Sequence, residues 1–329
     1  MNTKFPATAL IPAPAPALPA ALAAKLEEHA HAARGALAPE TERAMRKASA
    51  AFTGWAASRA LEPPLPATPG TVAAYVDHMA AHGWAPASIR QAAWAIGAMH
   101  RAAGVEDPTK AEVVRLALKR MGKALGTRQR QAAPIGEYEL RRIMETAGTR
   151  LADQRNLALL LTMRDLLARR SEVVALDVAD VAYDRDGSAT VLIRRSKTDQ
   201  LAEGAELYLS ARAVAALRRW LAAAGISEGA AFRAVNKGGR VGERLQPDQV
   251  ARIVKRMAER AGLKPEVVAR VSGHSCRVGM AQDLVAGGAD LAGVMQAGRW
   301  KSPMMPARYT ARLEAKRGAV AQLYQRQSG

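Results

Sequence analysis

The segment Gly273-His274-Ser275-Cys276-Arg277 begins the part of the sequence that decides the fold. Several helical patterns follow it closely. Apolar residues recur at helical spacing at about 276–287, 290–296 and 302–308, and again from Ala311 to about Gln327. Such spacing predicts helices that bury one face. Gly298-Arg299-Trp300 and Tyr309 lie at the ends of these patterns, so this part of the chain is predicted to be helical with polar and aromatic residues between its helices.

Three short segments upstream have the character of strands, at residues 178–183, 189–195 and 206–210. Residues 184–187 form a turn between the first two segments, and residues 198–204 connect the last two. Helical patterns at 136–147, 151–168, 211–224 and 246–261 surround them. We therefore expect a mainly α domain with a small antiparallel β-sheet.

The N-terminal half has helical patterns only. They cover about 21–33, 39–61 and 71–81, a stretch that begins at Pro86, and 109–125, and no strand-like alternation interrupts them. Residues 1–20 are predicted to be an Ala/Pro-rich flexible arm, and the polar, basic residues 126–134 a linker ending in proline. The expected domains are a helical one at 21–125 and a second at 135–329.

Composition limits the class of protein. The 329 residues carry 48 Lys and Arg against 30 Asp and Glu, a net charge of +18, which favours a polyanionic partner such as nucleic acid. A ribosomal protein, a membrane-surface protein or a generally basic proteome would give the same surplus. Cys276 is the single cysteine, so an intramolecular disulfide is excluded. The sequence has no run of about 18 apolar residues, so no membrane span is predicted. We expect a cytoplasmic protein.

Four segments hold the residues that phosphodiester transfer without a metal would need. Arginines neutralise non-bridging oxygens, a tyrosine hydroxyl forms a covalent intermediate, and an acid protonates the leaving 5′-oxygen. Taken singly, each residue has an ordinary explanation, such as a solvated arginine, a buried histidine or a core aromatic. Their order is what points to chemistry. The set is Arg169, Lys197, His274, Arg277, Trp300 and Tyr309.

The order Arg, Lys, His-x-x-Arg, Trp, Tyr resembles the signature of the tyrosine recombinases, or phage integrase family. Gly273 to Ala281 and Val294 to Trp300 look most like the Cre-like branch, which has an indole where many relatives have histidine. The resemblance covers roughly residues 35–325. It implies a helical core-binding domain and a C-terminal catalytic domain that close on DNA as a C-shaped clamp, with no metal or nucleotide cofactor.

The resemblance also implies a role for each residue. Arg169 and Arg277 would hold the scissile phosphate, with Glu172 supporting Arg169; the neighbouring Arg170 lacks a Glu at that spacing. His274 and Trp300 would donate hydrogen bonds to a non-bridging oxygen, and Lys197 would be the general acid. Tyr309 would form a 3′-phosphotyrosyl bond on the way to a Holliday junction.

The family further implies double-stranded DNA with inverted-repeat arms and a homotetramer on two sites, joined through a C-terminal exchange helix at 311–327. Residues on the second predicted helix, at the start of two later helices or in a Gly-rich turn are candidates to contact bases or phosphates. They are Arg43, Arg46, Lys47, Ser88, Arg90, Gln91, Lys237, Arg240, Gln246, Asp248, Gln249 and Arg252. Each of them could equally be an ordinary surface residue.

Two other functions remain open at this point. A type IB topoisomerase would use nearly the same chemistry as a monomer that needs no paired sites. A DNA-binding regulator or architectural protein would use the basic charge without cutting DNA.

Overall fold

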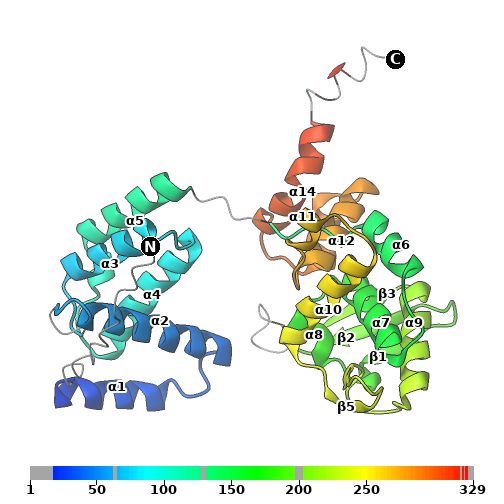
Figure 1. Ribbon diagram of the computed structural model, residues 1–329, viewed down its shortest axis with the longest axis horizontal. Coiled ribbons are helices and arrows are strands. Elements are labelled where there is room, and N and C mark those ends of the chain that lie inside the picture. Colours follow the sequence, from blue (N-terminus) through cyan, green and yellow to red (C-terminus); the bar gives the residue numbers. More distant parts are fainter. Residues whose placement is uncertain are drawn as a thin grey trace, which may run out of the picture. The chain divides into compact units, whose positions relative to one another are not determined.

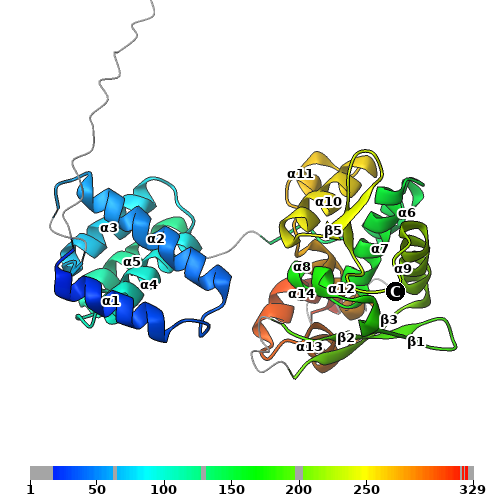
Figure 2. The same ribbon diagram turned by 90° about the horizontal axis from the view of Figure 1, so that it is seen from below.

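The computed structural model describes residues 18–61, 65–126, 131–196 and 203–318, together with Ala321, Leu323 and Tyr324 (Figures 1 and 2). The chain divides into two compact units, Met1–Gln129 and Arg130–Gly329. Among the described residues, no helix is long and apolar enough to cross a membrane.

The first unit is entirely helical over its described residues. Its elements are α1 (Ala20–Ala32), α2 (Pro39–Ala57), α3 (Pro69–Ala81), α4 (Pro86–Ala102), the 3-10 turn η1 (Pro108–Lys110) and α5 (Glu112–Leu125). Helices α2, α3 and α4 each start with proline, which fits a first turn because its nitrogen needs no hydrogen-bond partner there.

Aromatic side chains form the centre of this unit. Tyr75 lies between Phe52 and Trp55, with ring centroids 5.2 and 4.9 Å away. His100 is fully buried, and its Nε2 accepts a hydrogen bond from the Ala67 amide at 2.8 Å. Burial holds the pKa of His100 below its ordinary value, so the neutral ring is a core acceptor.

The second unit contains the remaining elements. They are α6 (Glu137–Glu145), α7 (Leu151–Asp165), α8 (Arg170–Ala175), the 3-10 turn η2 (Val178–Asp180), β1 (Val181–Tyr183), β2 (Ala189–Ile193), β3 (Ala205–Leu209), α9 (Ala211–Ala224), β4 (Arg233–Val235), β5 (Val241–Arg244), α10 (Pro247–Arg260), α11 (Pro265–Val268), α12 (Ser275–Ala286), α13 (Leu291–Gly298) and α14 (Met304–Arg317).

Strands β1, β2 and β3 form an antiparallel sheet in that order. Val191 lies opposite Val181 on one side and Leu207 on the other. In β2 the side chains of Val191 and Ile193 are buried while Leu192 between them is exposed, so one face of the sheet packs on the core. The expected mainly α fold with a small antiparallel sheet is confirmed.

Four local features differ from the sequence-based expectation. The strands β4 and β5 form a hairpin that we did not expect, around the Gly-rich turn. The helix expected at 151–168 ends at Asp165, because Leu167 takes a left-handed conformation (φ 43°) and α8 then starts separately. Residues 126–134 were expected to be linker throughout, whereas Ala133 is buried and donates its N–H to the Arg270 carbonyl at 3.0 Å.

The fourth difference concerns the segment around Tyr309. Two helices were expected, at 302–308 and from Ala311, but α14 runs without a break from Met304 to Arg317. Pro306 does not interrupt it, since the nitrogens of a first helical turn need no partner within the helix. Tyr309 is therefore held on a continuous helix, and the part of the expected exchange helix at 319–327 lies mostly outside the described residues.

Candidate active site

Arg277 lies at the centre of the candidate site. It is 2% exposed, in the first turn of α12. Its guanidinium donates to the Leu167 carbonyl at 2.5 Å and to the Gly298 carbonyl. Burial, reinforced by the nearby Arg169 and Arg299, lowers the pKa of Arg277 to about 10. The group stays protonated at neutral pH but lies where a negative charge would be stabilised.

Glu172 is a buried carboxylate shared by two arginines. Its Oε1 accepts from Arg169 Nη1 at 2.6 Å, and its Oε2 accepts from Arg299 Nη2 at 2.7 Å. The Arg169 amide also donates to Oε2 at 2.9 Å, because Arg169 caps the start of α8. Burial alone would raise the pKa of Glu172, but Arg299 and Arg169 outweigh it and hold the pKa below its ordinary value. Two guanidinium groups therefore bind one ionised carboxylate, and this carboxylate also acts electrostatically on Arg277, whose pKa it raises against the effect of burial.

Trp300 connects Arg277 to Tyr309. The Arg277 guanidinium carbon lies 4.5 Å from the centroid of the Trp300 ring, a cation–π arrangement. Tyr309 is 9% exposed and meets the same indole edge-on, with ring centroids 5.7 Å apart. These rings pack in a hydrophobic cluster with Leu167 and Val278, so α12, α13 and α14 are joined at the site.

Glutamine side chains anchor the main chain of Tyr309. Gln282 Nε2, on α12, donates to the Tyr309 carbonyl at 2.9 Å, and Gln131 Nε2 donates to it at 3.4 Å. In this structure Tyr309 is thus fixed on its own chain, next to Arg277 and Trp300.

The remaining two members of the predicted set are placed differently. His274 is exposed at the start of α12, one helical turn before Arg277, and its amide donates to Ser272 Oγ at 3.2 Å. Lys197 lies outside the described residues, directly after Ser196.

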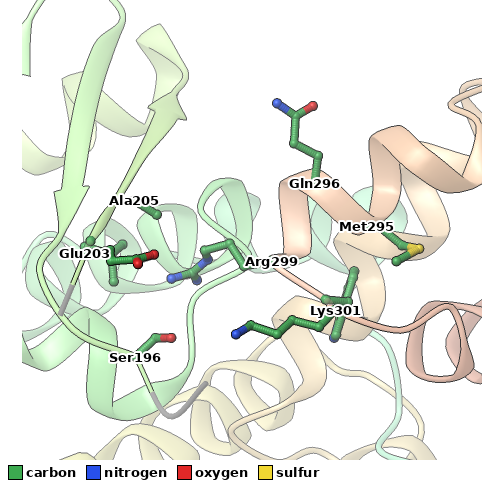
Figure 3. Close-up of a pocket in the computed structure, with 10 residues that line it drawn as sticks. Ser196, Glu203, Ala205, Met295, Gln296, Arg299 and Lys301 are labelled. Atoms are coloured by element: carbon green, nitrogen blue, oxygen red, sulfur yellow. The ribbon is translucent and has the colours of Figure 1, made fainter. Parts of the chain in front are cut away.

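A pocket of about 310 Å³ opens beside this cluster. Figure 3 shows the Arg299 side chain pointing across it toward Glu203 and Ser196, with Lys301 extending toward Ser196 below. Trp300 also lines the pocket, so the pocket adjoins the Arg277–Tyr309 contact.

The structure thus forms two series of contacts, Arg169 with Glu172 and Arg277 with Trp300 and Tyr309, and the charges of Arg169 and Glu172 act on Arg277. Arg299 belongs to the same cluster and was not predicted. An arginine beside a tryptophan gives no sequence signal of its own, since most arginines are solvated. The helix was predicted to end at residue 296, whereas α13 ends at Gly298, so nothing in the sequence indicated that Arg299 would follow a helix end directly.

The predicted DNA-contacting residues lie on the surfaces of both units. In the first unit, Arg43 and Arg46 on α2 are exposed and pair with Glu40 at 3.0 Å and Glu42 at 3.9 Å. Exposed positions there also include Lys47 on α2 and Arg90 and Gln91 on α4, while Ser88 is half-buried.

In the second unit, Lys237 and Arg240 are exposed in the turn between β4 and β5. Gln246 caps α10, and Asp248 and Arg252 pair on that helix at 3.3 Å. Gln249, in the first turn of α10, is half-buried.

Comparison with known proteins identifies the family to which the chain is similar. The phage integrase family matches residues 135–316. Cre recombinase of Escherichia phage P1 is 28% identical over 275 residues, which cover 78% of this chain and 80% of Cre. An integrase/recombinase xerD homolog of Selenomonas ruminantium is 31% identical over 256 residues, 74% of each chain.

Solved structures share the fold. XerH site-specific recombinase bound to palindromic difH substrate matches with a TM-score of 0.60 and 20% identity, over 82% of this chain and 77% of that chain. A lambda integrase dimer bound to a COC′ core site matches with a TM-score of 0.59 and 17% identity, over 88% of this chain and 77% of that chain. The chain therefore belongs to the phage integrase family of tyrosine recombinases and is related to Cre.

Proposed function

We propose that this recombinase cleaves and rejoins DNA through a 3′-phosphotyrosyl bond to Tyr309, with Arg169 and Arg277 holding the scissile phosphate. The observation that carries the proposal is the contact chain from Arg169 through Glu172 to Arg299, and from Arg277 through Trp300 to Tyr309. The second of these series joins the Tyr309 ring to a guanidinium on another helix, and the charges of Arg169 and Arg299 act on that same guanidinium.

The charge of the cluster supports a phosphate ligand. Three guanidinium groups and one carboxylate leave an excess of positive charge, much of it shielded from water. Buried cations are costly unless they are paired. A phosphodiester entering the site would compensate this charge, and a phosphorane-like transition state with more charge on its oxygens would compensate it further.

The proposed reaction conserves the number of phosphoester bonds. The Tyr309 oxygen attacks phosphorus as its proton leaves, and His274 is the proposed acceptor of that proton. The bond to the 5′-oxygen breaks, and Lys197 supplies the proton for the new 5′-hydroxyl. A 5′-hydroxyl from another strand then reverses the step and releases Tyr309. Because the phosphotyrosine keeps the bond energy, no nucleotide cofactor is needed.

The proposed partner is double-stranded DNA with inverted-repeat arms. The XerH structure is bound to palindromic difH substrate and the lambda integrase dimer to a COC′ core site. The net charge of +18 supports a DNA partner here as well. We further propose a homotetramer on two sites, joined through the C-terminal segment and passing through a Holliday junction, in the cytoplasm. Base contacts are assigned to the exposed residues of α2, α4, α10 and the β4–β5 turn named above.

A covalent-capture experiment tests this function. The full chain is incubated with a library of randomised duplexes that carry a nick, the protein is denatured, and DNA that remains attached is sequenced. We expect an enriched inverted-repeat site and an adduct that Tyr309→Phe abolishes while binding to the enriched site is retained. No adduct with any duplex would favour the DNA-binding regulator.

A second arm separates recombination from relaxation. Two plasmids, each carrying the enriched site, are mixed with the protein and scored for strand exchange. Exchange that requires both sites supports the recombinase, whereas relaxation of a supercoiled plasmid lacking the site would indicate a topoisomerase.

A further inference from the structure

Arg299 has an unusual backbone conformation for its residue type. It follows the last residue of α13 with φ 53° and ψ 46°, in the left-handed region that normally favours glycine. Gly298, the last residue of α13, precedes it, and a Cβ at Gly298 would collide with the Trp300 ring. Strained residues of this kind concentrate at functional sites.

The Arg299 side chain is only partly paired. It is 13% exposed, and Nη2 binds Glu172 Oε2 at 2.7 Å. Its Nε and Nη1 are buried and have no hydrogen-bond partner within the part of the chain that the structure describes. A buried cationic group with unused donors is costly, and an incoming acceptor would relieve that cost.

The position of these donors indicates what the acceptor is. Arg299 lines the pocket of about 310 Å³ together with Trp300, Lys301 and Ser196, the residue before Lys197 (Figure 3). Glu203 also lines this pocket, and Glu172 already occupies one Arg299 donor. The pocket is therefore lined both by Trp300, the ring on which Arg277 stacks, and by Ser196 and Glu203.

We infer that Arg299 is a third arginine donor to the scissile phosphate, in addition to Arg169 and Arg277. The inference rests on the proposed function and deepens it. Glu172 orients Arg169 and Arg299 together, and the free donors of Arg299 bind a non-bridging oxygen whose charge increases as Tyr309 attacks. A lysine at this position would be a poorer substitute, since its single ammonium cannot bind Glu172 and the phosphate from separate nitrogens.

The test compares Arg299→Gly with a matched control. Glycine adopts the left-handed conformation without strain, so the fold should be retained. Arg185→Gly removes the same charge from an exposed position in the turn between β1 and β2. Initial rates of strand cleavage are measured below both melting temperatures on the enriched duplex, with either a phosphodiester or a methylphosphonate at the cleaved position.

We expect Arg299→Gly to slow cleavage of the phosphodiester by on the order of 10²-fold, as for loss of a transition-state donor. On the methylphosphonate, which lacks one charged oxygen, the deficit should be at least several-fold smaller. Arg185→Gly should match the parent on both substrates. Equal deficits on both substrates, or none, would overturn the inference, because a general structural defect does not depend on the charge of the phosphate.

A measurement of anion binding tests the role of Arg299 independently of the proposed function. Millimolar orthovanadate should raise the melting temperature of the parent chain and of Arg185→Gly, and raise that of Arg299→Gly clearly less. If the parent forms no DNA adduct but this difference is present, the function fails and the anion contact stands. If the parent forms an adduct and the vanadate shift is equal in all three proteins, Arg299 is not an oxyanion ligand.

Discussion

The indole of Trp300 lies edge-on to the phenol of Tyr309, with an interplanar angle of 70° and 5.7 Å between the ring centroids. Arg277 stacks on the same indole at 4.5 Å. Aromatic pairs of this geometry are worth about 0.5–1.5 kcal/mol beyond the area they bury. Trp300 therefore has two separable properties, a ring that packs the site and an N–H that could reach a phosphate oxygen.

Trp300→Phe separates these two properties. Phenylalanine keeps a ring between Arg277 and Tyr309 but has no donor. We expect a melting temperature close to that of the parent and cleavage slowed on the order of 10²-fold. Trp300→Ala removes the ring as well and should also destabilise the second unit, by up to about 3 kcal/mol in chemical denaturation. Parental cleavage by the phenylalanine variant would show that the indole N–H is not used.

Glu172→Gln tests the shared carboxylate. The variant leaves Arg169 and Arg299 without a buried counter-ion, so we expect destabilisation of about 3 kcal/mol at neutral pH. The pKa of Glu172 is lowered in the folded protein, so its stabilisation is fully present above the unfolded value of about 4.3 and is lost as pH falls through the lower folded value. Urea unfolding of both proteins from pH 7 to pH 3 measures this.

The difference between the two unfolding free energies should stay constant from pH 7 to about pH 5 and shrink below the unfolded value. A difference that grows in acid would contradict the assignment of Glu172 as ionised. Glu139→Gln offers a comparison, because Glu139 accepts a hydrogen bond from the Gly136 amide at 3.0 Å and has no ion pair among the described contacts.

Helical periodicity predicted most elements of both units, because helices that bury one face leave a strong pattern in the sequence. The β4–β5 hairpin was missed since its strands, Arg233–Val235 and Val241–Arg244, are short and only half-buried. The break at Leu167 was also missed. A leucine with positive φ reflects tertiary packing, here burial in the cluster with Tyr309, and not a local preference.

The candidate site was predictable where residue order carries chemistry. The choice of Arg169 over Arg170 rested on the spacing to Glu172, and in the structure Arg169 binds Glu172 while Arg170 is exposed. Arg299 was not predictable, because a single arginine after a short helical pattern is usually a solvated side chain. Its left-handed backbone and its ion pair with Glu172 depend on the tertiary structure.

Gly279→Ala tests how closely α12 approaches the start of the second unit. A Cβ at Gly279 would collide with the backbone of Ile135 and Gly136, and backbone atoms cannot move aside as a side-chain end can. The Ile135 amide also donates to the Ser275 carbonyl at 3.0 Å, so this segment is held in place. We expect a loss of about 3 kcal/mol, the upper range for overpacking, measured by urea unfolding.

Gly54→Ala is the matched control for that experiment. Gly54 lies within α2 of the first unit, and a Cβ there would meet nothing within 4 Å. Replacing a helical glycine at an open position should stabilise the first unit by about 0.5–1 kcal/mol. If both alanine variants behave alike, the close approach at Gly279 is not what limits packing.

Truncation after Gly318 tests the proposed role of the C-terminal segment in assembly. This cut keeps α14, which ends at Arg317, and leaves the anchoring contact from Gln282 to the Tyr309 carbonyl. Among the residues beyond it, Leu323 and Tyr324 are 55% and 64% exposed, as expected of apolar side chains that bind a neighbouring protomer. Adduct formation on a single nicked site should therefore match the full-length chain. Strand exchange between two sites and the tetrameric complex in sedimentation should both be strongly reduced.

The double variant Leu323→Ala with Tyr324→Ala in the full chain should reproduce the assembly defect without shortening the protein. Normal exchange by the truncated chain would instead mean that this segment packs on its own subunit and that protomers are joined elsewhere.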